Sequence, residues 1–338
     1  MILHYGVLDK FIEPLIQKIN NDFDPLDHIF LFGGNKKKYI SKEYKNFVHL
    51  QSRLQLFSII SHMNKADKII LHGLWDIKMT YLLYLQKWLL KKTYWSIWGG
   101  DLHRAINNRE KISFEIKAQN YVVKNVGHII AFLKGDYDLA RNKLNSKGKF
   151  HQCVMYQNNL QFIFDNISIE NSSLNILVGN SATESNFHFD IFEKLRKYKD
   201  YNIKIYCPLS YGDKEYGANV ISEGKSIFGE KFIPMLEFIP LNEYTKFLAK
   251  IDIGIYNQTR QQALANKIVL IGMGKKVFVN PKATDWEFYK QLGIEVFDIN
   301  NFIILENENY YNNENKLAVK KYFTEENYSE KLMKIFYS

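Results

Sequence analysis

Short apolar runs alternate with longer amphipathic segments along the first half of the chain. The runs predict buried strands at 2–8, 28–33, 68–73, 93–99 and 128–132. Between them, apolar residues recur at helical spacing and predict helices, notably at 53–63, 75–91 and 104–120. Strands and helices that alternate in this way form a parallel sheet with helices on both faces.

The alternation begins again after a polar segment at 164–173. Further strands are predicted at 174–180, 203–209, 232–236, 252–257, 275–280 and 294–299. Further helices are predicted at 184–198, 213–227, 241–250, 261–273 and 284–292. We therefore expect an α/β protein of two doubly wound, Rossmann-like domains with a cleft between them. The predicted parts are 1–165, 174–315 and, after an Asn- and Glu-rich loop at 301–315, a C-terminal helix in 316–338 that covers 316–336.

Composition narrows the kind of partner. The 338 residues carry a formal charge of +9, which favours an anionic partner such as a nucleotide phosphate or an anionic lipid. The lysines are spread along the chain, and no zinc-finger or RNA-recognition spacing is present, so we expect no nucleic-acid partner. Cys153 and Cys207 stand far apart, which is typical of a reducing compartment. No apolar run is long enough to span a membrane, and Asp9 and Glu13 interrupt any signal-like start, so a membrane role is expected to be peripheral.

Candidate chemistry lies where the predicted strands end, because open α/β sheets bind ligands at the carboxyl ends of their strands. In the first domain, Trp98, Gly99 and Gly100 end one strand, and Asp101 follows them. Asp101 is a candidate general base, with helix capping as the alternative. His72 ends a neighbouring strand and is a candidate contact for an acceptor, with a structural hydrogen bond as the alternative.

In the second domain, small and hydroxyl-bearing residues follow two predicted strands. They suit a phosphate near a helix N-terminus, although a plain turn also explains them. The candidate donor-binding residues in these two loops are Gly179, Asn180, Ser181, Ser210, Tyr211 and Gly212.

The most informative stretch is NQTRQQALAN at 257–266. Arg260, Gln261 and Gln262 gather at the predicted start of a helix, where a positive side chain is unfavourable unless an anion compensates it. This pattern predicts a diphosphate site that involves Arg260. The preceding loop places Glu243 and Tyr244 where a nucleotide sugar is expected, with a simple helix start as the alternative.

Two acidic pairs, at 22–24 and 136–138, are weak candidates for a metal site, because hard cations usually need more oxygen ligands. We expect no metal and no cofactor. The segment 81–95 mixes leucine, aromatic residues and lysine. One face of it fits an anionic membrane surface, and a core helix with solvated lysines is the alternative.

Five motifs, in this order, carry a resemblance to a known family. They are WGGDL (98–102), LVGNSATESNFH (177–188), PLSYG (208–212), FIPLNEY (238–244) and RQQALAN (260–266). The chain resembles the TDP-N-acetylfucosamine:lipid II N-acetylfucosaminyltransferases, the 4-alpha-L-fucosyltransferase-like enzymes of glycosyltransferase family 56. The resemblance implies a GT-B fold whose second domain binds a nucleoside-diphosphate sugar, with dTDP as the expected nucleotide.

The resemblance also implies a metal-independent transfer of a sugar such as N-acetylfucosamine to a polyprenyl-diphosphate-linked saccharide. The transfer would occur at the cytoplasmic face of the bacterial inner membrane, in the synthesis of enterobacterial common antigen, O-antigen or capsule. Arg260 would stabilise the departing diphosphate, and Asp101 would accept the proton of the attacking hydroxyl. A nucleotide-sugar epimerase of the same architecture and a non-catalytic nucleotide-sugar-binding protein are the alternatives.

Overall fold

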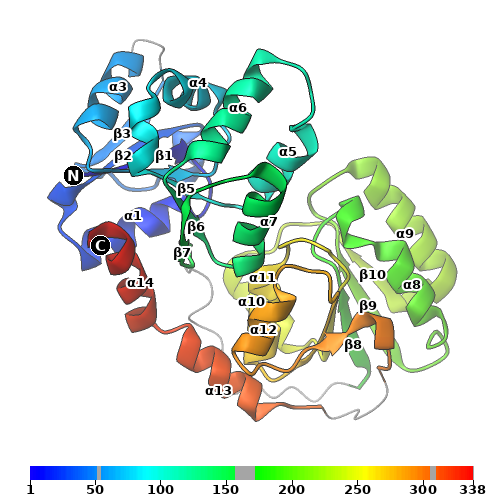
Figure 1. Cartoon of the computed structure of the whole chain (residues 1–338). Helices are drawn as coiled ribbons and strands as arrows, with labels where there is room; N and C mark the ends of the chain where they lie inside the picture. The colour runs from blue at the N-terminus through cyan, green and yellow to red at the C-terminus, as the bar shows by residue number, and fades with distance from the viewer. Residues whose placement is uncertain (52–54, 157–171, 305–309, 338) are drawn as a thin grey trace. The chain divides into compact units, whose positions relative to one another are not determined.

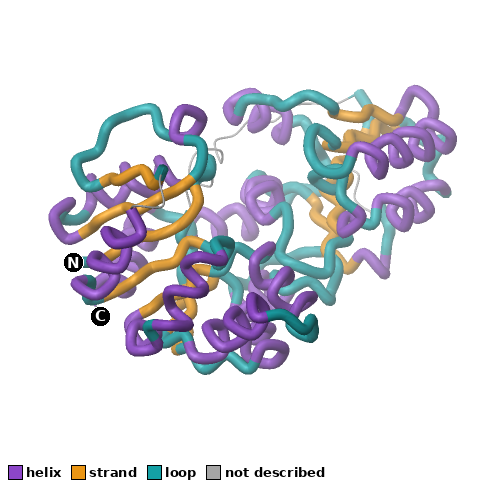
Figure 2. Tube along the Cα trace, turned by 90° about the horizontal axis from the view of Figure 1, so that it is seen from above, coloured by secondary structure: helices purple, strands orange, loops and turns teal. Residues whose placement is uncertain are grey.

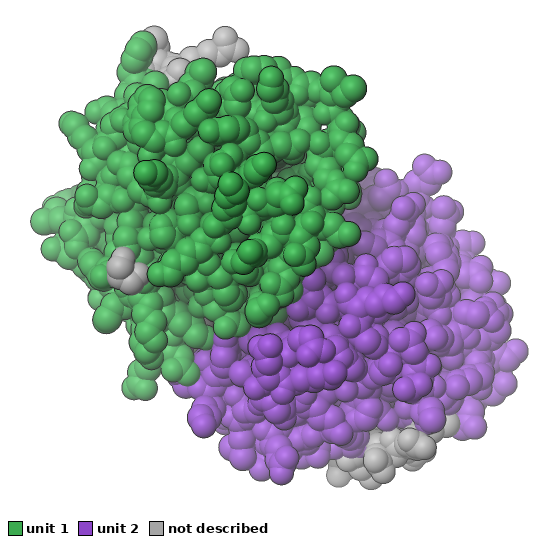
Figure 3. All heavy atoms as spheres, in the orientation of Figure 1, with its two compact units in different colours: residues 1–158, 325–338 green, residues 159–324 purple. Residues whose placement is uncertain are grey.

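The computed structural model describes residues 1–51, 55–156, 172–304 and 310–337. The chain forms two compact units (Figure 3), which are considered separately below: unit 1 contains residues 1–158 and 325–338, and unit 2 contains residues 159–324. Most of the predicted polar linker at 164–173 and part of the predicted loop at 301–315 lie outside the described residues.

Unit 1 is built around a parallel sheet that has seven strands among the described residues, in the order β3-β2-β1-β4-β5-β6-β7. The strands are β1 (Ile2–Val7), β2 (His28–Gly33), β3 (Phe47–Leu50), β4 (Lys68–His72), β5 (Thr93–Ser96), β6 (His128–Ala131) and β7 (Lys149–Gln152). The chain order reverses between β1 and β4, which is the topological switch point where ligands bind in such sheets.

Helices cover both faces of this sheet (Figure 1), as a parallel sheet requires. The helices of unit 1 are α1 (Ile12–Asp22), α2 (Lys36–Tyr39), α3 (Leu56–Lys65), α4 (Ile77–Leu85), α5 (Gly100–Asn108), α6 (Phe114–Asn125), α7 (Lys134–Leu144) and α14 (Glu325–Tyr337). In β4, Ile69 and Leu71 pack in the core under α3 to α7, whereas Ile70 packs in the core under α1 and α14. Successive side chains of a strand point to opposite faces, which explains the continuous apolar run.

Several predicted elements of unit 1 differ in the structure. The helix predicted over 75–91 ends at Leu85, and a 3₁₀ turn, Lys87–Lys92, leads into β5. The helix predicted over 104–120 is two helices, α5 and α6, separated by an exposed connection. The edge strands β3 and β7 were not predicted, because their side chains are partly exposed and carry no apolar run.

Unit 2 repeats the architecture with six strands among the described residues, in the order β10-β9-β8-β11-β12-β13. The strands are β8 (Leu174–Val178), β9 (Ile203–Pro208), β10 (Phe232–Met235), β11 (Ile253–Tyr256), β12 (Lys276–Val279) and β13 (Phe297–Asp298). The helices are α8 (His188–Arg196), α9 (Lys214–Phe228), α10 (Leu241–Ala249), α11 (Leu264–Gly272), α12 (Trp286–Gln291) and α13 (Asn313–Tyr322). Figure 2 shows the strands with helices beside them. The switch point of this sheet lies between β8 and β11.

The single helix predicted over 316–336 is instead two helices that belong to different units. α13 packs against α11 in unit 2. Thr324 and two glutamates then form a helix-start signal, and α14 joins the core of unit 1. There Leu332 and Phe336 are buried, and the Tyr328 hydroxyl donates to the carbonyl oxygen of Met155 over 2.8 Å.

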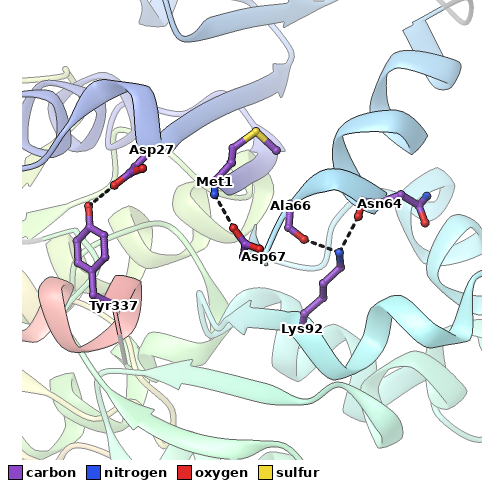
Figure 4. A network of polar contacts seen from close by, with 7 residues as sticks. All are labelled: Met1, Asp27, Asn64, Ala66, Asp67, Lys92 and Tyr337. Carbon is purple, nitrogen blue, oxygen red and sulfur yellow. Dashed lines mark hydrogen bonds and ion pairs between the residues drawn. The ribbon is translucent and has the colours of Figure 1, made fainter.

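Polar contacts fasten the amino-terminal edge of the first sheet (Figure 4). The ammonium group of Met1 lies 2.6 Å from the Asp67 carboxylate, and the Tyr337 hydroxyl donates to Asp27 over 3.1 Å. The Lys92 ammonium donates to two backbone carbonyl oxygens at the C-terminal end of α3. Lys92 therefore serves the fold at this edge, away from the strand ends that carry the candidate site.

Candidate functional site

The loop after β8 begins with a glycine that the fold requires. Gly179 has φ +66°, a conformation that side chains disfavour. A Cβ there would lie 2.8 Å from His188 Nε2 and 2.9 Å from Asn186 Oδ1. Nε2 of the buried His188 has no hydrogen-bond partner among the described residues, and burial lowers the pKa of this histidine to about 4. A neutral imidazole therefore lies against the backbone at the sheet's switch point.

Asn186 is the buried centre of this loop. Its Oδ1 accepts from the backbone amide of Asn180 over 3.1 Å and from Gln258 Nε2 over 2.7 Å. Its Nδ2 donates to the Thr183 hydroxyl over 2.8 Å and to the carbonyl oxygen of Ser181 over 3.0 Å. Gln258 follows β11, and Asn186 lies in the loop after β8. The Asn186 side chain therefore joins the two loops that follow the strands at the switch point.

A second layer of polar contacts joins the same two loops. Arg260 donates from a terminal guanidinium nitrogen to the Ser185 hydroxyl over 3.2 Å. Gln262 accepts from Ser185 over 2.9 Å and donates to the Thr183 hydroxyl over 3.2 Å. Arg260 is half-buried, and its Nε has no hydrogen-bond partner among the described residues. The guanidinium thus keeps donor capacity for an anion.

α11 begins directly after these residues. Its N-cap residue, Ala263, has φ +56° and gives no side-chain hydrogen bond to the helix. The first backbone amides of a helix need acceptors, and an alanine in the left-handed region is strained. Strain of this kind clusters at ligand sites. Gln261 lies beside this helix start, half-buried.

A second cation near this site is already compensated. Lys267, in α11, is fully buried and forms an ion pair with Asp285, which is also fully buried. The Tyr289 hydroxyl donates to the same Asp285 oxygen over 3.1 Å. The charge of Lys267 is therefore compensated inside unit 2, whereas Arg260 forms no ion pair among the described residues.

The loop after β9 lies against the loop after β8. The Asn180 amide donates to the Tyr211 hydroxyl over 2.8 Å, and the backbone amide of Ala182 donates to the carbonyl oxygen of Tyr211. Gly212 has φ +118°, and a Cβ there would lie 2.3 Å from the Ala182 carbonyl oxygen. The glycine permits this close contact. Ser210 is half-buried in the same loop.

The predicted sugar-side pair lies on α10. The Tyr244 hydroxyl accepts from Asn266 Nδ2 of α11 over 2.9 Å, and burial raises the Tyr244 pKa. Glu243 is exposed in the first turn of α10. Tyr244 is thereby tied to the helix that Arg260 precedes, whereas Glu243 faces solvent.

In unit 1, Asp101 is buried and accepts four hydrogen bonds. Oδ1 accepts from the backbone amides of Trp98 and Leu102 over 3.0 and 2.9 Å. Oδ2 accepts from the Leu74 amide over 2.9 Å and from Trp95 Nε1 over 2.7 Å. Burial raises the pKa of Asp101, and these hydrogen bonds partly oppose the rise. Both oxygens are engaged with the protein, so the geometry favours an anchoring role over the predicted general-base role.

The two glycines before Asp101 have separate structural reasons. Gly99 has φ +81° and precedes α5. Gly100 lies under an indole ring, because a Cβ on it would lie 2.9 Å from Trp75. Gly73, with φ +78°, passes under the same indole. Trp75 is also covered by the Arg104 guanidinium, whose carbon lies 4.9 Å from the ring centroid.

His72 begins a chain of hydrogen-bonded rings in the interior of unit 1. The Tyr156 oxygen accepts from Trp98 Nε1 over 2.7 Å and lies 2.6 Å from His72 Nδ1. His72 Nε2 lies 3.0 Å from His4 Nδ1, and His4 Nε2 lies 3.0 Å from His28 Nδ1. Burial lowers the pKa of His72 to about 3 and that of His28 to about 4, so these rings are neutral at pH 7. Each neutral imidazole has one N–H, so the position of the proton on one histidine determines its position on the next histidine in this series.

The comparisons with known proteins decide the family. The model of the 4-alpha-L-fucosyltransferases, glycosyl transferase group 56, matches residues 6–329. The chain belongs to this family. The predicted family is therefore confirmed, and this group 56 protein is a glycosyltransferase.

Solved structures resemble the whole fold of this group 56 glycosyltransferase. A glycosyltransferase from Rickettsia africae ESF-5 is 12% identical, with a TM-score of 0.62, 99% of this chain covered and 97% of the other. Sucrose-phosphate synthase from Thermosynechococcus elongatus is 9% identical, with a TM-score of 0.68 and coverage of 99% and 98%. Anabaena Alr3699/HepE, solved with UDP and glucose, is 9% identical, with a TM-score of 0.58 and coverage of 99% and 92%. The predicted GT-B fold is confirmed.

No group of three or more histidine, cysteine or acidic residues that could hold a metal occurs within the described part of this glycosyltransferase. In the acidic pair at 136–138, Asp138 pairs with Lys134 over 2.7 Å. In the pair at 22–24, Asp22 pairs with Lys18 over 2.7 Å.

The structure gives residues of the predicted loops structural roles that the sequence did not assign to them. Asn186 is hydrogen-bonded to the predicted residues Asn180 and Ser181. Gln258 is hydrogen-bonded to Asn186 and so holds it in place. Asn186 lies in the motif 177–188 and Gln258 in the stretch 257–266, so the sequence marked their segments but not their contacts. Tyr156 follows the unpredicted strand β7, so nothing nearby in the sequence marked it.

Proposed function

We propose that this glycosyltransferase moves a sugar from a nucleoside diphosphate to a lipid-linked saccharide, with the donor bound in unit 2. The observation that carries the proposal is the half-buried Arg260, beside the uncapped start of α11 and at the switch point between β8 and β11. The helix start contributes about half a positive charge, and the guanidinium adds a fixed one. A diphosphate supplies the acceptors and the negative charge that this arrangement lacks.

The remaining donor contacts follow from the same arrangement. Gly179, Asn180 and Ser181 present a closely held backbone at the end of β8, which suits contact with phosphate or sugar oxygens. Gln262 is hydrogen-bonded to the β8 loop, whereas the Gln261 side chain forms no hydrogen bond to that loop among the described residues and can contact the donor. Tyr211 and Tyr244 flank the strand ends and suit the base and sugar. The UDP bound in Anabaena Alr3699/HepE supports a nucleotide donor by analogy of fold.

The proposed reaction forms one bond and breaks one bond at the anomeric carbon. An acceptor hydroxyl oxygen forms a bond to the anomeric carbon of the sugar, and the bond from that carbon to the diphosphate oxygen breaks. The hydroxyl proton passes to the departing diphosphate, directly or through water. Negative charge then grows on the diphosphate, where Arg260 and the amides of α11 stabilise it most as the bond breaks. We propose that unit 1 holds the acceptor at the half-buried Trp98, and that Asp101 positions Trp98 rather than taking the proton. His72 is buried behind Trp98 and supports it through Tyr156, as in the structural alternative to the predicted acceptor contact.

We propose the finer identity from the resemblance described above: an N-acetylfucosamine-type donor on dTDP and a polyprenyl-diphosphate-linked acceptor of a bacterial surface polysaccharide. The match to the 4-alpha-L-fucosyltransferase family supports a fucose-type donor sugar. The proposed donor and acceptor determine which reagents are used in the first transfer assay.

No helix among the described residues is long and apolar enough to cross a bilayer.

The test is calorimetric binding of dTDP, UDP, GDP and ADP to the full chain. Arg260→Ala should weaken binding of the preferred diphosphate about 30-fold or more, because a charge-assisted contact to phosphate is worth about 2 kcal/mol or more. Arg196→Ala is the matched control, since Arg196 lies on α8 of the same unit and pairs with Glu193 over 3.0 Å. Equal affinities for wild type and Arg260→Ala would remove the diphosphate assignment. Binding without transfer to any lipid-linked acceptor would favour a binding protein or an epimerase.

A further inference from the structure

The connection between α5 and α6 carries two apolar side chains into solvent. Ile112 is completely exposed, at 104% of its reference area, and Phe114, the first residue of α6, is 61% exposed. The connection links two well-formed helices of unit 1 (Figure 1). Exposed apolar residues that stand together at a chain turn indicate contact with a partner rather than a core.

Phe114 rests on an aromatic base. Its ring centroid lies 5.6 Å from that of Tyr81 and 5.8 Å from that of Tyr84, both on α4. Tyr84 in turn packs against Tyr121 of α6, and the Lys87 ammonium lies 4.9 Å from the Tyr121 ring centroid. The exposed tip is therefore held by packed helices, and its apolar side chains are presented on a rigid support.

Lysines flank the tip. A shallow hollow at this place is lined by Lys111, Ile112, Ser113, Phe114, Lys117 and Asn120. Lys111 and Lys117 are exposed, and neither forms an ion pair with another described residue. The nearby acid Glu110 is paired with Arg109 over 3.1 Å, and Glu115 lies in the first turn of α6, where the helix dipole stabilises it. The side chains of 109–117 thus carry a net positive charge beside the exposed Ile and Phe, and the Lys87 ammonium adds to it, which matches the chemistry of an anionic bilayer surface.

We propose that residues 111–117, supported by α4, are the membrane-docking surface of this enzyme. Ile112 and Phe114 enter the interfacial layer of an anionic leaflet, and Lys111, Lys117 and Lys87 lie at the level of the lipid phosphates. The inference rests on the proposed function in one respect: an enzyme whose acceptor is lipid-linked must reach the membrane. The docking surface shares Lys87 with the surface predicted from the sequence over 81–95, whereas Lys92 of that segment is bound to the end of α3.

The test is flotation of the full chain with vesicles of phosphatidylcholine alone or mixed with phosphatidylglycerol. The variant Ile112→Ser/Phe114→Ser should lower partition to mixed vesicles about tenfold or more, because two exposed apolar side chains lose their insertion. The variant Lys111→Gln/Lys117→Gln should lower partition about tenfold on mixed vesicles and far less on phosphatidylcholine. Leu26→Ser is the matched control, since Leu26 is 89% exposed on another part of unit 1.

Three results would overturn the proposal. The first is wild-type partition by the Ile112→Ser/Phe114→Ser variant, and the second is an equal loss with Leu26→Ser. The third is a wild-type dimer by light scattering that this variant converts to a monomer, which would assign the surface to a second copy. Nucleoside-diphosphate binding is measured on every variant and should be unchanged. Its absence in the wild type, with docking intact, would refute the proposed function and leave the docking surface standing.

Discussion

Gln258 donates from Nε2 to Asn186 Oδ1 over 2.7 Å, and both side chains are completely buried. The contact joins the loops after β8 and β11, the two strands between which the chain order of the second sheet reverses. An amide pair without access to water holds its geometry, because breaking it leaves buried polar groups unpaired. The proposed donor site is therefore organised before any ligand arrives, which is what a site that stabilises a leaving group needs.

Gly179→Ala should damage this organisation, and the chain offers a matched control. Gly179 and Gly293 both have φ +66°, so alanine should cost each backbone about 1 kcal/mol. Only at Gly179 would the new methyl group also collide, with His188 Nε2 at 2.8 Å and Asn186 Oδ1 at 2.9 Å. We expect Gly179→Ala to lose a further 1–3 kcal/mol or so of unfolding free energy, and to bind nucleoside diphosphate about tenfold or more weakly.

The measurements are urea denaturation and calorimetry on both variants. Gly293→Ala should bind nucleoside diphosphate like the wild type, because nothing lies within 4 Å of the added Cβ. If the two variants behave alike, the packing of the β8 loop against Asn186 is not what shapes the site.

Asp101→Asn separates anchoring from base catalysis. An amide nitrogen in place of either carboxylate oxygen would face two N–H donors, from Trp98 and Leu102 or from Leu74 and Trp95. We expect the variant to lose about 3 kcal/mol of unfolding free energy, and to lose turnover with it. Both should be measured, by urea denaturation and by sugar transfer at saturating donor.

The partly exposed Asp138, on α7 of the same unit, provides the control: Asp138→Asn should change stability by less than about 1 kcal/mol. If Asp101→Asn folds as stably as the wild type yet transfers no sugar, the carboxylate acts on the substrate, and the general-base prediction from the sequence holds.

Stability should fall in mild acid because of buried neutral histidines. The pKa values of His72, His28 and His188 in the folded chain are about 3, 4 and 4, against 6.5 for the free side chain. The unfolded chain therefore binds protons first as the pH falls. The contribution of each histidine is complete above about pH 6.5, and about 1.4 kcal/mol of it is lost per pH unit down to about pH 4.

Urea denaturation of the full chain between pH 7 and about pH 4.5 measures this slope. His188→Asn should reduce the slope for unit 2 by about one proton, while the slope for unit 1 stays unchanged. A wild-type stability that is flat over this range would mean that the buried histidines take up protons without unfolding.

The sequence predicts the sheets well and the site in part. Runs such as 174–180 and 252–257 mark central strands, because both faces of these strands are buried. Arg260 was predicted because an arginine at a helix start has no partner of its own there. Asn186 and Gln258 lie in predicted motifs, but their contact could not be predicted, because it forms only when two loops far apart in the sequence meet. Asp101 is the opposite case, a residue that the sequence singled out as a base. Its hydrogen-bond donors Leu74 and Trp95 come from other parts of unit 1, so the sequence around Asp101 did not show that both carboxylate oxygens are occupied.

The passage of the chain back into unit 1 at α14 has a consequence for how the protein is made. Tyr328, Leu332 and Phe336 complete the core that also contains α1 and the first strands, and Lys68 holds the end of α14 through the carbonyl oxygen of Ile335 over 2.7 Å. During synthesis the ribosome therefore releases every segment of unit 2 before it supplies the helix that closes unit 1. Synthesis of unit 1 thus starts before that of unit 2 and finishes after it, and the apolar face of unit 1 stays uncovered until α14 has been made.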